Sequence, residues 1–508
     1  MIAAFLEGNH TMTPDEFRAA GHALVEWIAD YRERLQAGDF PVQAPVHPGD
    51  ILRQIPRAAP EQAESFEQML ADLEAIILPG ITHWQHPRFF GYFPSGGSLA
   101  SVLGDMASTG FAAIGLNWQA SPALTELEQA MCDWLRDLLG LPGTFSGVLQ
   151  DTASSASLVA LVCARERSSG YAAVRGGLQE HGRALIVYTS QQAHSSVEKA
   201  ALLAGFGREH VRAIAVDENF RLSLPALQDA IRSDRAAGHV PCAIVATTGT
   251  TATTAMDPIA GIAAIAQRES AWLHVDGAMG GAAMILPECR MLWEGIEAAD
   301  SIAVNPHKWL GVAFDCSLYL LRDPEHLVRV MSTNPTYLQT AVDHDVRNYR
   351  DWGIPLGRRF RALKIWFTLR DSGAAALRDR LRRDIAMAQE FAAAMTALPH
   401  WRLAAPLTLQ TVCLRHEPPG LDDPGLDAHT RRWAQAVNDS GEAYVTPAVI
   451  AGRWAVRVSV GSEGTRAEDM EALQGILARA TEKSAAEAIR KHPKRKHACH
   501  PHITAPGI

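Results

Sequence analysis

Two residues in the middle of the chain carry side chains suited to covalent and acid–base chemistry. Asp276 directly follows the apolar run 272–275, and Lys308 comes shortly after the apolar run 301–304. Short, continuous apolar runs of this kind predict parallel strands that are buried on both faces. Because ligands bind at the carboxyl ends of such strands, we expect Asp276 and Lys308 to share a site. Taken singly, the acid could simply cap a helix and the lysine could belong to a structural ion pair.

A third segment is suited to binding a phosphate group. Residues 150–156 include Thr152 and Ser154 and open a predicted helix, whose first N–H groups form a natural anion site. A lysine, a carboxylate and a phosphate site together meet the needs of pyridoxal phosphate. The lysine attaches this cofactor, and the carboxylate keeps its pyridine nitrogen protonated so that the ring accepts electrons. With all three in one predicted domain, a plain serine or threonine cap is the weaker explanation.

The elements that must position these residues begin with two helices. The first opens with a capping box at Thr13 and Glu16, and the second opens at Ser65 and ends at residues 79–80. From about Ser121, apolar runs alternate with helical stretches, which predicts an α/β domain with a mostly parallel sheet. The predicted strands of this domain are residues 184–188, 211–216, 242–247, 272–275 and 301–304.

A different pattern follows after about Ser372. A long helix rich in alanine and arginine precedes short strands, a second helix and a last helix that opens with a capping box at Thr465 and Glu468. This pattern predicts a small α+β domain. We therefore expect a helical segment at residues 1–85, a large α/β domain at 86–370, a small α+β domain at 371–481 and a disordered basic tail at 482–508.

Composition narrows the class of protein. The 508 residues are 47% hydrophobic and 20% charged, which is typical of a globular chain. Lys+Arg 47 against Asp+Glu 56 gives a net charge of −9, which argues against nucleic acid as a partner. No apolar run reaches the length of a membrane span, and the first residues do not form a secretory signal. The 7 cysteines form no paired motif, so we expect a soluble cytoplasmic protein.

Eight short segments, in this order along the chain, resemble the group II pyridoxal-phosphate-dependent decarboxylases. The resemblance is strongest to the aromatic-L-amino-acid (DOPA) decarboxylases, in a bacterial version, and it runs from about residue 13 to about residue 480. NPHKW at 305–309 is the most specific of the motifs. The segments are THWQHPRFF at 82–90, GLNWQASPALTELE at 115–128, AHSSVEKA at 193–200, VATTGTT at 245–251, LHVDGA at 273–278, NPHKWL at 305–310, NPTYLQ at 334–339 and IPLGRRFRALKIW at 354–366.

This resemblance implies a fold-type I enzyme. Its members are obligate homodimers with an N-terminal helical clamp, a large seven-stranded domain, a small C-terminal domain and an active site at the subunit interface. The implied cofactor is pyridoxal 5'-phosphate, and no metal is expected. The implied reaction is decarboxylation of an aromatic L-amino acid to the arylalkylamine and carbon dioxide. DOPA, 5-hydroxytryptophan, tryptophan, tyrosine and phenylalanine all remain candidate substrates.

The resemblance also assigns roles residue by residue. It makes Lys308 the cofactor-linked lysine, Asp276 the partner of the pyridine nitrogen and His194 the residue that stacks on the ring. Tyr337 belongs to a mobile catalytic loop and would protonate the substrate carbon, with His194 assisting. The other cofactor-binding residues are Thr152, Ala153, Ser154, Thr247, Asn305 and His307. The expected substrate pocket contains Trp84, Tyr92, Phe93, Ser95 and Gly357, with Ile114 and Leu116 from the other subunit.

Four positions depart from the pattern of the family. Animal members have an aromatic residue in place of Met279 and phenylalanine in place of Leu116, so the ranking of substrates is open. Asp151 stands where many relatives have glycine, and Ser155 where they often have glutamate. Gly357 leaves room that a larger residue would remove, so the pocket does not exclude an indole ring.

Alternative hypotheses remain at this point. Aldehyde synthases couple decarboxylation to oxidative deamination, and they typically replace the loop tyrosine by phenylalanine or the stacking histidine by asparagine. Tyr337 and His194 both match the decarboxylases instead. A non-aromatic substrate is disfavoured by the aromatic-rich segment 84–93, and a non-enzymatic relative by the complete catalytic set. The histidines of the tail predict adventitious metal binding rather than a designed site.

Overall fold

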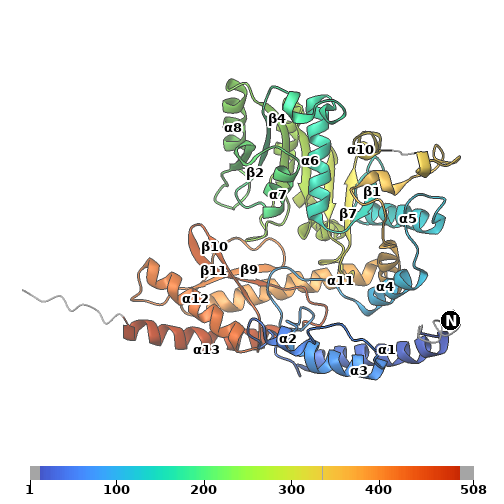
Figure 1. The fold of residues 1–508 in the computed structure, drawn as a ribbon. Coiled ribbons are helices and arrows are strands. Elements are labelled where there is room, and N and C mark those ends of the chain that lie inside the picture. Colours follow the sequence, from blue (N-terminus) through green and yellow to red (C-terminus); the bar gives the residue numbers. More distant parts are fainter. Residues whose placement is uncertain (1–11, 334–335, 492–508) are drawn as a thin grey trace, which may run out of the picture.

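The computed structural model describes residues 12–333 and 336–491. A large α/β domain stands above a small C-terminal domain, and the N-terminal helices lie along the base of the molecule (Figure 1). Those helices are α1 (Pro14–Ala37), α2 (Asp50–Gln54) and α3 (Phe66–Asp72). The predicted starts are confirmed, because Thr13 and Glu16 form a full capping box and the Ser65 hydroxyl accepts the Gln68 N–H. Along α1, Leu35 alone is buried.

The large domain is built on a seven-stranded sheet. The strands are β1 (Ser146–Gln150), β2 (Leu185–Ser190), β3 (Val211–Ile214), β4 (Val240–Thr247), β5 (Trp272–Asp276), β6 (Ser301–Val304) and β7 (Ser317–Leu321). Their order is β1-β7-β6-β5-β4-β2-β3. Each predicted strand is present, and the mostly parallel sheet is confirmed. β7 was not predicted, and it runs antiparallel to both of its neighbours, β1 and β6.

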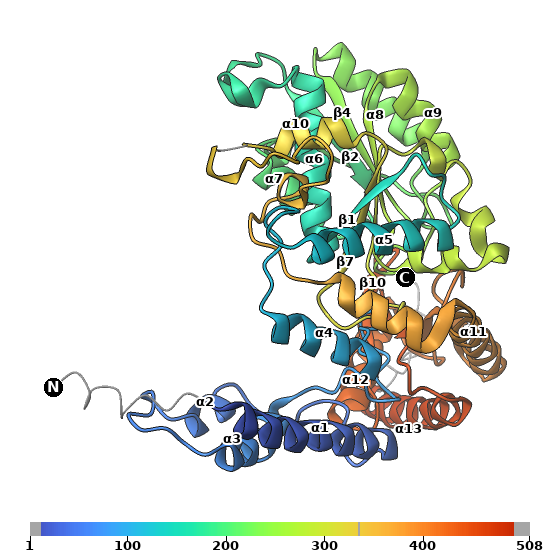
Figure 2. The same cartoon turned by 90° about the vertical axis from the view of Figure 1, so that its right-hand side faces the viewer.

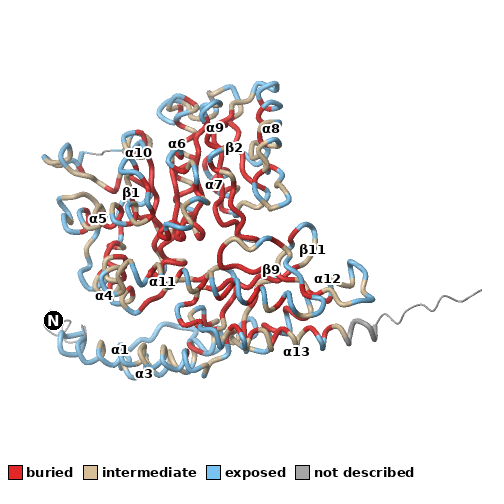
Figure 3. The backbone as a smooth tube through the Cα atoms, turned by 180° about the vertical axis from the view of Figure 1, so that it is seen from behind, coloured by how far each residue is buried: buried red, intermediate tan, exposed pale blue. Residues whose placement is uncertain are grey.

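Helices cover both faces of this sheet, as Figure 2 shows. The helices of the large domain are α4 (Leu99–Phe111), α5 (Pro122–Leu138), α6 (Ala153–Ser169), α7 (Ser195–Leu203), α8 (Leu224–Ala236), α9 (Ile259–Glu269) and α10 (Pro324–Met331). Of these, α4 does not cover the sheet but lies below it, against α11. Successive residues of a strand face opposite sides. Thus Val245 and Ala246, neighbours on β4, belong to two different apolar cores. Burial is concentrated in these layers, whereas the N-terminal helices are largely exposed (Figure 3).

The small domain contains a four-stranded antiparallel sheet in the order β10-β11-β9-β8. Its elements are β8 (Trp401–Leu403), β9 (Thr411–His416), α12 (Asp423–Asp439), β10 (Thr446–Ile450), β11 (Arg453–Ser459) and α13 (Ala467–Lys491). The helix α11 (Ala362–Ala397) connects it to the large domain and is kinked at Gly373, where φ is 72° and ψ is 157°. The predicted boundary between residues 370 and 371 lies close to this kink.

Two details of the last helix differ from the prediction. Thr465 does not cap it, because its hydroxyl donates instead to the carbonyl of Pro87 at 2.6 Å. Asp469 accepts the N–H of Arg466 at 3.0 Å in its place. In addition, α13 continues to Lys491, into the segment that was expected to be a disordered tail. The remainder of that tail, residues 492–508, lies outside the described part of the chain. Within the described part, no helix is both long and apolar enough to cross a membrane.

Candidate active site

A cavity of about 560 Å³ lies where the central strands of the large sheet end. The strand register places Thr247, Asp276 and Ala303 beside one another at the ends of β4, β5 and β6. This arrangement brings together most of the residues predicted from the sequence. The predicted residues that line the cavity are Trp84, Tyr92, Phe93, Thr152, Ala153, Ser154, His194, Thr247, Asp276, Asn305, His307 and Lys308.

Lys308 projects from the turn that follows β6. Its Nζ lies 5.5 Å from the centre of the Phe93 ring, and it makes no hydrogen bond to any other described residue. Burial lowers the pKa of Lys308, while the nearby Asp276 charge opposes this shift. A lysine held in this way is more easily deprotonated than a surface lysine, as a nucleophilic amine requires.

Asp276 is the last residue of β5 and is almost fully buried. Its Oδ1 accepts the N–H of Ala278 at 3.0 Å, which fixes the carboxylate at the strand end. A buried carboxylate without a cation bound to it is costly unless a ligand compensates. A protonated ring nitrogen would supply that compensation.

His194 is held by the start of α7, where it is the cap residue. Its Nδ1 lies 2.8 Å from the Ser196 hydroxyl and accepts the Ser196 N–H at 3.2 Å. Burial lowers the pKa of His194, so the imidazole is neutral at pH 7. With Nδ1 engaged, Nε2 is the ring nitrogen that remains for a ligand in the cavity.

The start of α6 lies at the cavity, where it could hold a phosphate group. Thr152 caps this helix by its backbone alone, since its side chain makes no cap hydrogen bond. Asp151 Oδ1 accepts the Thr152 N–H at 2.7 Å, which gives this unusual aspartate a structural role. Two further buried polar atoms at the cavity, Thr247 Oγ1 and Asn305 Oδ1, have no hydrogen-bond partner among the described residues. Such atoms normally have partners, so these are available to a bound ligand.

His307 lies on the same turn as Lys308. Its Nδ1 accepts the N–H of Cys316 at 2.9 Å, and its ring meets the Phe314 ring edge-on. Burial and the neighbouring Lys308 charge lower the pKa of His307 to about 4, so this side chain is neutral. It therefore lines the cavity without adding charge.

Aromatic rings form one wall of the cavity. Trp84 and Tyr92 are stacked, with ring centroids 5.3 Å apart, and Tyr92 also stacks on Tyr444 at 5.9 Å. The two tyrosine hydroxyls lie 3.2 Å apart. Tyr444 and Phe89, whose rings are also stacked, extend this aromatic cluster behind the wall. The wall offers flat apolar surface to a planar substrate.

The sequence interpretation missed the contribution of the small domain. Arg457 on β11 is buried, and it donates to the carbonyls of Ala252 at 2.9 Å and Tyr92 at 3.1 Å. Its guanidinium lies 5.0 Å from the centre of the Phe93 ring. An arginine inside an otherwise apolar strand is the signal that could have identified it. Thr446 and Ala448 of β10 also line the cavity.

Some predicted residues lie outside this lining. Ile114 is exposed and sits beside Gly357, where an added Cβ would meet Ile114 Cγ2 at 3.4 Å. Ser95 and Leu116 do not line the cavity either. The backbone of Tyr337 belongs to a short 3-10 helix (Thr336–Leu338), but its side chain lies outside the described part of the structure. Met279, one of the departures from the family pattern, does line the cavity, and its sulfur accepts from Gln410 Nε2 at 3.3 Å.

The donor set of the cavity fits pyridoxal phosphate. Lys308 would hold it covalently, and Asp276 would pair with its ring nitrogen. The unpartnered oxygens of Thr247 and Asn305, with the first turn of α6, would surround its polar groups. This fit rests on the geometry of the chain alone.

Comparisons with known proteins agree with this assignment. The pyridoxal-dependent decarboxylase conserved domain matches residues 48–417. The chain is 38% identical to "Tyrosine decarboxylase 4" of Petroselinum crispum, over 92% of this chain and 94% of that protein. It is also 38% identical to "Phenylacetaldehyde synthase" of Arabidopsis thaliana, over 92% of this chain and 96% of that protein.

A solved structure shows the same fold. The crystal structure of Oryza sativa TDC with PLP and tryptamine superposes with a TM-score of 0.90 at 33% sequence identity, covering 94% of this chain and 99% of that one. The lysine and carboxylate at neighbouring strand ends, the family match and this superposition lead to one conclusion. The chain belongs to the pyridoxal-dependent decarboxylase family.

Proposed function

We propose that this enzyme decarboxylates aromatic L-amino acids to arylalkylamines and carbon dioxide. The observation that carries the proposal is the stacked pair Trp84 and Tyr92 on the wall of the cavity that holds Lys308 and Asp276. Relatives that bear the names tyrosine decarboxylase and tryptophan decarboxylase support an aromatic substrate. Because both rings are large and apolar, a small acidic substrate would gain little from this wall.

Each proposed catalytic residue has a defined task. Pyridoxal phosphate, when bound, supplies an electron-accepting ring that takes up the electron pair left behind by carbon dioxide. Lys308 would hold the cofactor through its side-chain amine. Asp276 keeps a proton on the ring nitrogen, and its burial makes this electrostatic contribution larger than it would be in water. His194, neutral and fixed by Ser196, would lie against the cofactor ring.

A proton must then reach the carbon that has lost carbon dioxide. Tyr337 is the proposed donor, because a phenol carries a transferable proton and its segment follows α10 at the rim of the large domain. His194 Nε2 would assist. Closure of such a segment over the substrate would also exclude water from the site.

We further propose a cytoplasmic homodimer. Large apolar side chains are exposed along α4 and the segments near it, and surface of this kind marks protein interfaces. Ile114 and Leu116, which do not line the cavity of their own chain, would then reach the cavity of the partner. The cysteines of the described chain are all unpaired, in keeping with a reducing compartment. The exposed apolar residues are Leu99, Leu103, Met106, Phe111, Ile114, Phe314, Ile354 and Leu356.

One observation favours a second candidate activity. A relative named phenylacetaldehyde synthase matches this chain at the same 38% identity as the tyrosine decarboxylase. An aldehyde synthase couples decarboxylation to oxidative deamination. His194 and Tyr337 are the residues expected of a decarboxylase, so we propose the amine as the main product.

The test is a substrate panel assayed under air and under nitrogen. DOPA, 5-hydroxytryptophan, tryptophan, tyrosine, phenylalanine and glutamate are each supplied to the loaded enzyme, and carbon dioxide, amine, aldehyde and hydrogen peroxide are measured. We expect amine in equal yield under both atmospheres from at least one aromatic substrate. Aldehyde and peroxide as the main products in air would establish the synthase instead. Release of carbon dioxide from glutamate alone would overturn the aromatic assignment.

A further inference from the structure

Trp309, the residue after Lys308, is held on two sides by helix α11. Its indole Nε1–H donates to Asp384 Oδ2 at 2.9 Å, and its carbonyl oxygen accepts from Arg380 Nη2 at 2.5 Å. Both partners lie beyond the kink at Gly373, on the second part of α11. Thus the second part of α11 holds the residue next to the proposed cofactor lysine through its side chain and its main chain.

The backbone of this turn leaves room for the side chain of Arg380. Gly311 has a φ of +80°, and a Cβ added there would lie 2.6 Å from Arg380 Nη1. A residue with a side chain at 311 would therefore displace the arginine. The same turn is closed by its own hydrogen bonds, from Lys308 N–H to the Asn305 carbonyl at 3.0 Å and from Gly311 N–H to the Lys308 carbonyl at 3.2 Å. Because Trp309 is the next residue in this turn, a change in the position of Trp309 would also move Lys308.

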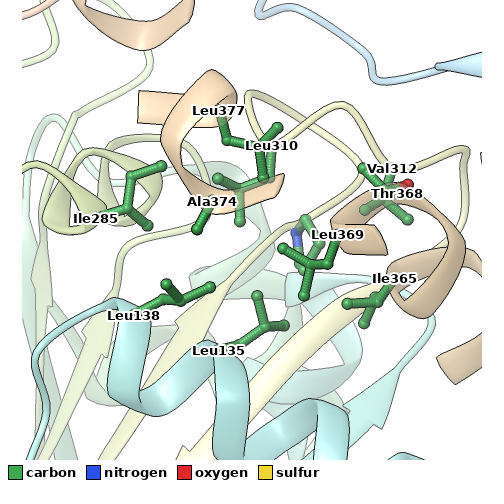
Figure 4. A pocket seen from close by; sticks show the side chains of 11 residues that line it. Leu135, Leu138, Ile285, Leu310, Val312, Ile365, Thr368, Leu369, Ala374 and Leu377 are labelled. Atoms are coloured by element: carbon green, nitrogen blue, oxygen red, sulfur yellow. The ribbon is translucent and has the colours of Figure 1, made fainter. Parts of the chain in front are cut away.

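The other contact of the turn with α11 is apolar. Leu310 lines a small cavity together with Ala374 and Leu377 of α11 (Figure 4). Most of its other lining residues come from α5 and the first half of α11. Apolar contacts of this kind hold two elements together without fixing direction. The polar contacts to Trp309 are directional, so they can set the orientation of the turn.

A buried carboxylate such as that of Asp384 is not needed merely to hold two parts of the protein together. The side chain of Asp384 is fully buried, and burial raises its pKa while the charges of Arg380 and Arg383 oppose that shift. Burying a carboxylate is costly, and an apolar residue of similar size would join two surfaces at least as well. An exposed ion pair from the same helix, between Arg382 and Glu288 at 2.7 Å, already joins α11 to the large domain at the surface.

We propose that Asp384 and Arg380 are positioning residues that orient Lys308 toward the cofactor by holding Trp309. This inference rests on the proposed role of Lys308. The chain that follows Gly373 then contributes to the active site in two ways, through Arg457 at the cavity wall and through α11 behind the lysine turn.

The experiment compares four single variants and one double variant of the full-length enzyme at saturating pyridoxal phosphate. Asp384→Leu and Trp309→Phe remove the indole hydrogen bond, Asp384→Asn keeps an acceptor without the charge, and Arg382→Ala removes the exposed ion pair as a matched control. Measurements are kcat, KM, thermal unfolding and the visible absorbance of the lysine-linked cofactor per folded subunit. All assays are run well below the unfolding temperature of every variant.

We expect Asp384→Leu and Trp309→Phe to lower kcat by about 10- to 100-fold, with KM changed by less than about threefold, because misplacement of a reacting group acts on the chemical step. The visible absorbance should weaken or shift in both. Asp384→Asn should restore most of kcat and the absorbance, and Arg382→Ala should leave both unchanged. The double variant Trp309→Phe/Asp384→Leu should have a kcat no lower than that of the more impaired single variant, because both substitutions remove the same hydrogen bond.

Other outcomes would contradict the proposal. If Asp384→Leu and Trp309→Phe lower the unfolding temperature but keep kcat and absorbance, the contact serves only to join the domains. If Asp384→Leu does not fold, Trp309→Phe and Asp384→Asn decide the matter by the same readouts. The role of Lys308 itself is tested separately by its own substitution, since loss of cofactor attachment in Lys308→Ala does not depend on Asp384.

Discussion

The imidazole Nδ1 of His274 lies 2.9 Å from the hydroxyl oxygen of Ser301, and both residues are fully buried. Ser301 accepts the indole N–H of Trp272 at 2.9 Å, so its own proton is free to be donated to His274. That assignment leaves the proton of His274 on Nε2, which faces Ser157 of α6 at 3.4 Å. A neutral histidine thus joins the strand that carries Asp276 to the strand before Lys308 and to helix α6.

This bridge predicts sensitivity of the fold to acid. Burial lowers the pKa of His274 to about 4, against about 6.5 in the unfolded chain. Between these values the unfolded chain binds more protons, so stability is full above about pH 6.5 and falls as the pH drops toward 4. For His274 alone, the free energy of unfolding should fall by roughly 1 kcal/mol between pH 7.5 and 5.5. Urea titrations at the two pH values measure it.

The control for that measurement is His274→Gln, which cannot titrate. This variant is expected to be less stable at pH 7.5, yet to lose less stability on acidification than the parent enzyme. His307, His416 and His429 have pKa values lowered to about 4 in the same way and remain in both proteins. An equal loss on acidification in the two proteins would show that His274 takes no part.

Substitution of Lys308 tests cofactor attachment. Lys308→Ala should abolish turnover and the visible absorbance, because no other lysine lines the cavity within the described chain. The buried Lys364, which might be considered a substitute, donates to the carbonyl of Asp315 at 2.6 Å and is engaged elsewhere. Borohydride reduction followed by peptide mass mapping locates the linkage, with Lys199→Ala as a control at an exposed lysine. Turnover near the parent rate in Lys308→Ala would refute the assignment.

Asp276→Asn tests the ring-nitrogen partner. The variant should fold but decarboxylate more slowly by about two to three orders of magnitude, because a preorganised charge of this kind contributes ~3–4 kcal/mol to the transition state. Single-turnover rates at saturating cofactor measure the effect. Asp300→Asn makes the same change just before β6 begins, at the end of that strand opposite the cavity. This variant should lose stability rather than catalytic rate. A loss of less than about tenfold for Asp276→Asn would identify Asp276 as a structural acid.

Tyr337→Phe distinguishes the decarboxylase from the aldehyde synthase. Phenylalanine has no proton to give, so the reacting carbon should stay unprotonated longer and become open to oxygen. We expect less amine, with new aldehyde, ammonia and hydrogen peroxide in air and little aldehyde under nitrogen. The ratio of aldehyde to amine, compared with that of the parent enzyme, is the measurement. An unchanged ratio would leave His194 as the first candidate for the proton donor.

Much of the large domain could be predicted because its strands are short, apolar and buried on both faces. Asp276 and Lys308 could be predicted to lie close together for the same reason, since Asp276 ends such a strand and Lys308 comes shortly after another. The direction of a strand is not encoded in this way. β7 is as continuously apolar as the parallel strands of the sheet, so nothing local marks it as antiparallel.

Contacts between distant parts of the chain were the ones that the sequence did not reveal. Thr465 has the spacing of a helix cap, but its hydroxyl bonds to Pro87 instead, a contact that exists only after folding. Arg457 comes close to Phe93 and Tyr92 in the same manner. The aromatic cluster was predicted only in part, because Tyr444 reaches Tyr92 from a different domain.

The helix α11 leads from the large domain into the small one, and its helical backbone geometry is broken at Gly373. A gene fragment cut at residue 370 would end just before this break and leave the lysine turn without Arg380 and Asp384. Neither half is thus a natural unit for expression, and a chain shortened from the C-terminal side would lose the small domain together with part of the support for Lys308.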